Sequence, residues 1–151
     1  NDDEWLWGGS LDQIMQTIEF GARSGHAKAH EGAMLAFGKD GILKKDQIVT
    51  VANFVRSLSG LSTAPGYDAS AGAKIFAENC SSCHGDNGKG NQELGAPDLT
   101  DKIWLYGSDQ ATLVETISNG RAGVMPAWIG RLDPSTIKAL TVYVHTLGGG
   151  K

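Results

Sequence analysis

The chain has 151 residues, of which 40% are apolar and 20% are charged, and its formal net charge is −4. This length allows one ordinary domain or two small ones. The acidic balance, with no basic stripe to offset it, argues against nucleic-acid binding. No apolar run approaches the roughly 20 residues of a membrane span. Two cysteines are too few for a disulfide framework, so we expect a globular protein whose two thiols share one purpose.

Apolar residues recur at helical spacing along the chain, and no convincing strand pattern appears. The apolar stripes of the predicted helices lie at residues 11–18, 48–58, 72–76, 113–117 and 137–147; the third helical stretch begins at Asp68 and ends at Cys80, and the stops of the first and fourth are Gly21 and Gly120. Asp46 and Asp133 are placed to cap the second and the last of them. Pro134 suits the first turn of the last helix, because proline lacks only a hydrogen that this turn does not use. The predicted fold class is all-α.

The two halves of the chain resemble each other in order. The matching segments are 5–8 with 104–107, 17–21 with 116–120, 34–37 with 125–128, and 48–58 with 137–147. The spacing changes only in stretches rich in glycine and charge, where loops tolerate insertions. We infer that the halves have a common origin.

A cluster of Ser, Thr, Gly and Pro at residues 59–66 has the composition of a linker. It predicts a partial first unit at residues 1–62 and a complete second unit at residues 67–151. The second unit has a helix and a cysteine motif before its Trp104, and nothing equivalent precedes Trp5. The apolar faces of the first unit need a cover, and we expect an upstream segment to supply it. The second unit and another copy of the chain are the alternatives.

Cys80 and Cys83 are separated by two serines and followed directly by His84, which is the attachment signature of c-type haem. Each thiol can form a thioether with a vinyl group, and the histidine then binds the iron. The other imidazole nitrogen should donate to a carbonyl, for which Pro97 is the candidate. A zinc site lacks a second ligand pair, and a redox dithiol lacks a βαβ setting. We expect one covalent haem c per chain, cycling between ferric and ferrous iron.

Met125 is the predicted sixth ligand, because a thioether fills the coordination site and raises the reduction potential. A methionine that fills a gap in the core is the alternative. Arg121 suits a haem propionate, with a plain surface arginine as the other interpretation. Trp104 and Tyr106 are expected in core packing, or against the haem and its propionates.

Three further side chains with ligand chemistry carry weaker expectations. His26 and His30 are four residues apart, a spacing that suits a metal only in a helix, so we expect solvated loop residues. Met34 matches Met125 in the repeat. Because no attachment motif precedes it in this chain, we expect Met34 to be unligated.

Several of these segments resemble a class I cytochrome c domain. The resemblance rests on the motif at residues 80–84, the turn at 95–99, Met125 with its following proline, and the closing helix. In that family the first and last helices cross where a glycine faces an aromatic residue. Gly72, Phe76 and Tyr143 fit that pattern.

A narrower resemblance covers nearly the whole chain. Segments 1–9, 36–41, 55–60, 103–107 and 119–121 are similar to the FixP/CcoP family, the di-haem subunit III of cbb3-type cytochrome c oxidases. The resemblance implies an electron carrier, not an enzyme by itself, that relays electrons from a donor cytochrome to the oxidase's catalytic subunits. It also implies the periplasmic side of a bacterial inner membrane, with a membrane anchor and a first haem upstream.

The chain departs from that family in two ways. The family's anchor helix and first attachment motif are not in this sequence, and Leu35 stands where the family usually has a proline after the first methionine. A free-standing periplasmic shuttle or a cytochrome subunit of a dehydrogenase remains the alternative. A haem enzyme or gas sensor, which needs an open iron position, is a third class.

Overall fold

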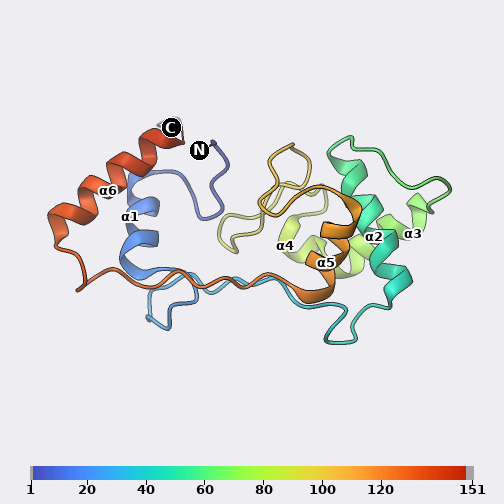
Figure 1. Ribbon diagram of the computed structural model, residues 1–151, viewed down its shortest axis with the longest axis horizontal. Coiled ribbons are helices and arrows are strands. Elements are labelled where there is room, and N and C mark those ends of the chain that lie inside the picture. Colours follow the sequence, from blue (N-terminus) through green and yellow to red (C-terminus); the bar gives the residue numbers. More distant parts are fainter. Residues whose placement is uncertain (1, 149–151) are drawn as a thin grey trace. The chain divides into compact units, whose positions relative to one another are not determined.

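The computed structural model describes residues 2–148, and within this range it contains helices and isolated β-bridges but no strand. The helices are α1 (Leu11–Phe20), α2 (Lys45–Leu58), α3 (Ala69–Asn79), α4 (Ser81–His84), α5 (Gln110–Asn119) and α6 (Pro134–Leu147) (Figure 1). The all-α class is confirmed for this range. None of these helices has both the length and the apolar character needed to cross a membrane.

Local capping explains where the helices begin. The Ser10 hydroxyl accepts the Gln13 N–H at 3.3 Å, and the Gln13 side chain accepts the Ser10 N–H at 3.1 Å, which forms a capping box for α1. Asp133 caps α6 as predicted, with proline in its first turn. The prediction for Asp46 is wrong, because α2 begins after Lys44. Asp46 lies in the first turn, where its negative charge still interacts favourably with the helix dipole.

The helices of the two halves match in length and in ending. α1 and α5 each have 10 residues, and α2 and α6 each have 14. The C-cap of α1 is Gly21 (φ 74°), and the C-cap of α5 is Gly120 (φ 69°). Each glycine N–H donates to a threonine carbonyl four residues earlier, at 2.9 Å. Positive φ favours glycine at both positions.

The chain forms two compact units that are not the contiguous ranges expected from the linker. Unit 1 consists of the chain up to Gly32, the segment Gln92–Pro97, and the chain from Ala122 onward. Unit 2 consists of Ala33–Asn91 and Asp98–Arg121. Each unit therefore combines stretches from both halves of the repeat, and the predicted linker at 59–66 lies inside unit 2.

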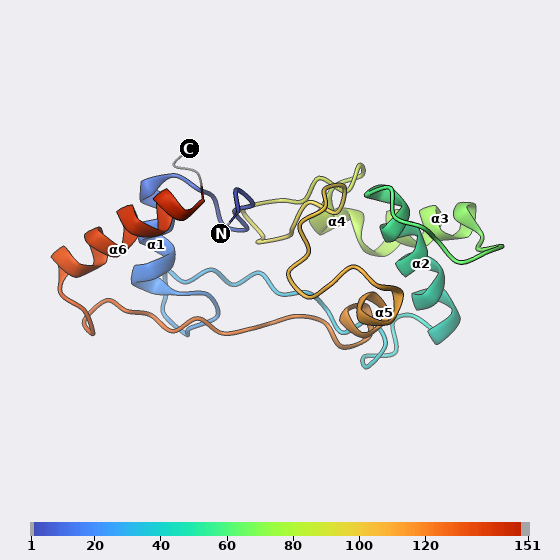
Figure 2. The ribbon, with the colours of Figure 1, turned by 45° about the horizontal axis from the view of Figure 1, so that its top comes forward.

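Unit 2 is built on α2, which packs against both α3 and α5 (Figure 2). Its buried core consists of Phe37, Leu43, Ile48, Val51, Ala52, Val55, Ile75, Phe76, Leu113 and Ile117. Burying an aliphatic side chain of this size contributes about 1.5–3 kcal/mol. The apolar stripe of α2 is therefore covered by helices of the second half, and the expectation of an upstream cover for this stripe is wrong.

The crossing of α2 and α3 has a glycine at its centre. A Cβ on Gly72 would lie 2.8 Å from the Cβ of Phe54, so only glycine allows this approach. The rings of Phe54 and Phe76 lie 5.4 Å apart at 51°. Tyr143, the aromatic residue expected here, is 61% exposed on α6. That expectation is wrong because α2, not α6, packs on α3, and Phe54 matches Tyr143 in the repeat.

Unit 1 is built on α1 and α6, which pack side by side (Figure 1). Ile14, Ile18 and Ile137 form its buried centre. The partly buried side chains around them are Trp5, Met15, Met125, Trp128, Leu132 and Val144. A helix of the first half is thus paired with the last helix of the second half.

The segments that carry Met34 and Met125 are likewise paired with the opposite half of the repeat. In unit 1, the Met125 N–H donates to the Ala22 carbonyl at 2.9 Å, and the Ala22 N–H donates back at 3.0 Å. In unit 2, the Met34 N–H donates to the Arg121 carbonyl at 3.0 Å. The backbone of each methionine is therefore hydrogen-bonded to the residue that follows the C-cap glycine of the short helix in the other half.

Candidate functional site

The cysteine motif lies in unit 2, at the point where α3 passes into the single turn of α4. The Cys80 N–H donates to the Phe76 carbonyl at 2.8 Å, and the His84 N–H donates to the Cys80 carbonyl at 3.0 Å. Cys80 is half-buried, Cys83 is exposed, and both are free thiols. One helical turn thus presents both sulfurs and the imidazole, as the motif predicts.

The chemistry of Cys80 argues against a redox dithiol. Burial, and after it the neighbouring Cys83, raises the pKa of the Cys80 thiol to about 11. Thiol–disulfide enzymes need the opposite, a lowered pKa that exposes a reactive thiolate. Cys80 is therefore protonated at neutral pH.

The surroundings of the motif fit a c-type haem. Cys80, Met34, Leu99 and Trp104 all pack against the core of unit 2. A haem is a flat, mostly apolar group, so it needs apolar walls as well as a donor set of two sulfurs and an imidazole. The residues present satisfy both needs, and Trp104 lies in core packing, one of its two expected settings.

Arg121 is held at the end of α5 by an aromatic ring and a hydroxyl. Its guanidinium carbon lies 3.9 Å from the centre of the Tyr106 ring, and its Nη2 donates to Thr116 Oγ1 at 2.7 Å. Tyr106 is 54% exposed, so the expectation of core packing for it is wrong. The role of Arg121 at a propionate stays a prediction.

Unit 1 contains the counterpart of this arrangement, with a histidine in place of the arginine. The His30 ring stacks on Trp7, with 4.3 Å between ring centres and 14° between planes. Its Nε2 lies 2.9 Å from Thr17 Oγ1. Trp7 and Thr17 are the repeat counterparts of the tyrosine and threonine that hold Arg121.

Neither loop histidine is simply solvated, contrary to the expectation. Burial, and after it Arg23, lowers the pKa of His30. The His26 ring stacks on Phe20 at 4.7 Å, and its Nδ1 accepts the Lys28 N–H at 3.1 Å. Sequence reasoning missed these contacts because a loop of glycine and charge gives no periodic signal. The repeat did match Trp7 with Tyr106 and Thr17 with Thr116.

The predicted sixth ligand and the motif belong to different units, and the role of Met125 stays a prediction. Met125 lies in unit 1, whereas Cys80, Cys83 and His84 lie in unit 2. The methionine in unit 2 is Met34. Pro97, the predicted carbonyl partner of His84, ends the short segment assigned to unit 1, and that bond stays a prediction.

Known proteins are similar in sequence to this chain over its full length. The family profile described as cytochrome c oxidase, cbb3-type, subunit III matches residues 68–144. Subunit FixP of the cbb3-type cytochrome c oxidase from Bradyrhizobium diazoefficiens is 81% identical over 100% of this chain and 52% of its own length. FixP from Bradyrhizobium sp. strain ORS 278 is 77% identical over the same shares. Subunit CcoP from Azospirillum brasilense is 53% identical over 99% of this chain and 53% of its own length. The chain spans about half the length of these relatives.

Proposed function

Because the chain belongs to the family of cbb3-type cytochrome c oxidase subunit III, we propose that it carries single electrons through one haem c held in unit 2. The observation that supports this most directly is the single turn that presents Cys80, Cys83 and His84. The protein is a carrier and performs no bond chemistry on a substrate. A haem held there supplies a reversible one-electron couple between ferric and ferrous iron.

The chain's own residues attach, orient and shield the group. The sulfurs of Cys80 and Cys83 hold it through thioethers, and the imidazole of His84 binds the iron. Trp104 and Leu99, which pack against the core, keep water from one side of the site. Arg121 supplies a fixed positive charge, suited to a propionate carboxylate.

The sixth ligand in this proposal is Met34, which replaces the sequence-based choice of Met125. Met34 belongs to unit 2, packs against the same core as Cys80, and is held by its bond to the Arg121 carbonyl. Met125 has the equivalent position in unit 1. By the symmetry of the repeat, Met125 would serve a haem attached to the first half of a longer protein.

We infer the direction of electron flow from the resemblance to the family. In this proposal the protein accepts electrons from a donor cytochrome and passes them to the catalytic subunits of a cbb3-type oxidase. It works on the periplasmic side of a bacterial inner membrane, with its membrane anchor upstream of this sequence. The net charge of −4 favours a donor with a complementary basic surface.

A haem count and two substitutions test the proposal. A pyridine haemochrome assay with intact mass measurement should give one haem per chain, resistant to acid acetone. Met34→Ala should abolish the weak ferric absorption band of sulfur–iron ligation and admit carbon monoxide to the reduced protein. Met125→Ala, the matched control, should leave both properties unchanged. Two haems, extractable haem, or loss of the band in Met125→Ala alone would contradict the proposal.

A further inference from the structure

The loop that leaves His84 is rich in glycine and is folded back by backbone hydrogen bonds. The Gly90 N–H donates to the His84 carbonyl at 2.8 Å, and the Leu99 N–H donates to the Gly88 carbonyl at 2.7 Å. Gly88 and Gly90 both have positive φ, at 74° and 78°. A loop without a helix has little rigidity of its own, so side-chain contacts decide how firmly it is held.

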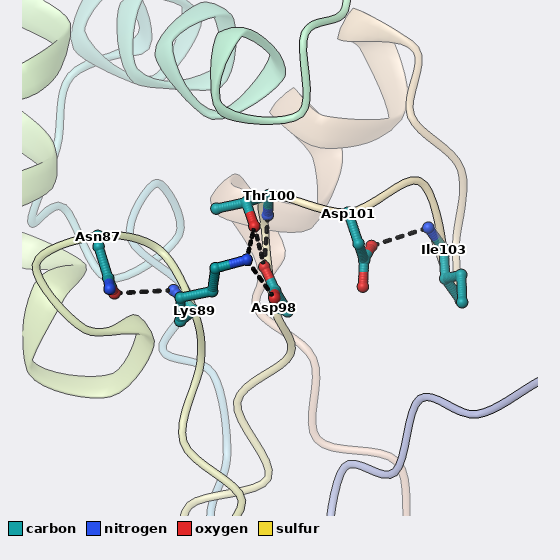
Figure 3. Close-up of polar contacts among 6 residues, drawn as sticks. All are labelled: Asn87, Lys89, Asp98, Thr100, Asp101 and Ile103. Carbon is teal, nitrogen blue, oxygen red and sulfur yellow. Dashed lines mark hydrogen bonds and ion pairs between the residues drawn. The ribbon is translucent and has the colours of Figure 1, made fainter.

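One side-chain cluster ties this loop to the segment that follows residue 97 (Figure 3). Lys89 Nζ lies 3.2 Å from Asp98 Oδ2 and 2.5 Å from Thr100 Oγ1. Asp98 Oδ1 accepts the Thr100 N–H and the Thr100 hydroxyl, each at 2.7 Å. Asn87 Oδ1 accepts the Lys89 N–H at 3.2 Å, which orders the base of the lysine.

The burial of Asp98 distinguishes this cluster from an ordinary surface ion pair. The Asp98 side chain is 17% exposed, and that of Lys89 is 60% exposed. Burial by itself raises the pKa of Asp98, but hydrogen bonds from Thr100 and Lys89 outweigh burial and lower it, so Asp98 is a carboxylate. Charge-assisted hydrogen bonds to a mostly buried carboxylate are roughly twice as strong as neutral ones. The Lys74–Glu78 pair of α3, at 3.9 Å and 76% and 58% exposed, lacks this advantage.

We propose that Lys89 and Asp98 are positioning residues for the proximal ligand His84, an inference that rests on the proposed haem site. Lys89 lies on the loop that begins at His84 and is joined to it by the bond from the Gly90 N–H to the His84 carbonyl. Asp98 lies next to Leu99, whose N–H bonds the returning stretch to Gly88 of the same loop. The ion pair holds these two stretches of chain together. It thereby keeps the loop that carries the imidazole in place, which fixes the orientation of the ligand.

The ring N–H of His84 reports on this role directly. In the ferric, haem-loaded full-length protein, its paramagnetically shifted proton resonance can be followed after transfer into D2O. Lys89→Met and Asp98→Asn should each speed its exchange about three- to tenfold, the range expected for losing a charge-assisted contact. Lys89→Arg should return the rate to within about twofold of the parent, because the charge and donor are retained. Lys74→Met, which breaks the exposed pair on α3, is the matched control and should change nothing.

The amides of α5 provide the internal reference, because a general loss of stability accelerates them as well. Unchanged exchange of the ring N–H in Lys89→Met would overturn the positioning role. Parallel acceleration of the ring N–H and the α5 amides would also overturn it, because the cluster would then act on stability alone. Absence of haem, or of shifted histidine resonances in the parent protein, would instead contradict the proposed haem site.

Discussion

Replacing Gly120 by alanine should damage the proposed haem site of unit 2 through Met34. A Cβ at this position would lie 2.4 Å from the Met34 carbonyl oxygen, a distance that side-chain carbons essentially never adopt. The backbone at Gly120 also has a φ of 69°. The new methyl group must therefore push the Met34 backbone away from the end of α5.

The magnitude follows from two separable costs. The backbone at Gly120 (φ 69°, ψ 177°) lies in a region that essentially only glycine adopts, and holding an alanine there costs about 1–3 kcal/mol. Moving the Met34 carbonyl breaks the bond between the Met34 N–H and the Arg121 carbonyl, which adds about 0.5–1.5 kcal/mol. Gly60→Ala isolates the first cost, because Gly60 has a φ of 73° and nothing within 4 Å of the added Cβ. The difference between the two variants should therefore be about 1 kcal/mol.

The assay compares three variants by urea unfolding and by the ferric sulfur–iron band. Gly120→Ala should lose stability and weaken the band, whereas Gly60→Ala should lose stability alone. Gly21→Ala, whose Cβ would lie 2.1 Å from the Met125 carbonyl oxygen in unit 1, should leave the band intact. If Gly21→Ala weakens the band and Gly120→Ala does not, Met125 is the ligand and the exchange between the halves is refuted.

Three further changes test the fold around the site. The fold lowers the pKa of His30, so unit 1 should lose stability as the pH falls below the ordinary value of 6.5. His30→Gln should remove this loss. Chemical unfolding measured against pH checks it, and equal profiles for the parent and His30→Gln would count against the prediction. Phe54→Ala should lower the free energy of unfolding in urea by about 1.5–3 kcal/mol, because it removes a partly buried ring at the α2–α3 crossing. Tyr143→Ala, whose side chain is exposed on α6, should cost under about 0.5 kcal/mol. A larger loss for Tyr143→Ala than for Phe54→Ala would contradict this packing. Asp133→Ala should speed amide exchange in the first turn of α6, and Asp133→Asn should retain most of the protection, since an asparagine also caps; no difference between the two would contradict the capping role.

Most of the helices could be predicted from the sequence because their signals are local. Apolar spacing, a capping aspartate before Pro134 and the stop at Gly120 each act within a few residues. The signal for the proposed haem-attachment turn is equally local, because Cys80, Cys83 and His84 are neighbours along the chain. Those features need no knowledge of what packs against them.

The pairing of the helices was decided only in the tertiary structure. The repeat offers two nearly equivalent partners for each surface: Phe54 or Tyr143 for the glycine of α3, and Met34 or Met125 for the end of α5. Equivalent side chains bury similar apolar area, so composition and spacing cannot distinguish them. Which partner is chosen depends on where the connecting segments lead in three dimensions. The sequence by itself therefore determined which side chains the proposed haem turn presents, and the tertiary structure decided which half of the chain completes each unit.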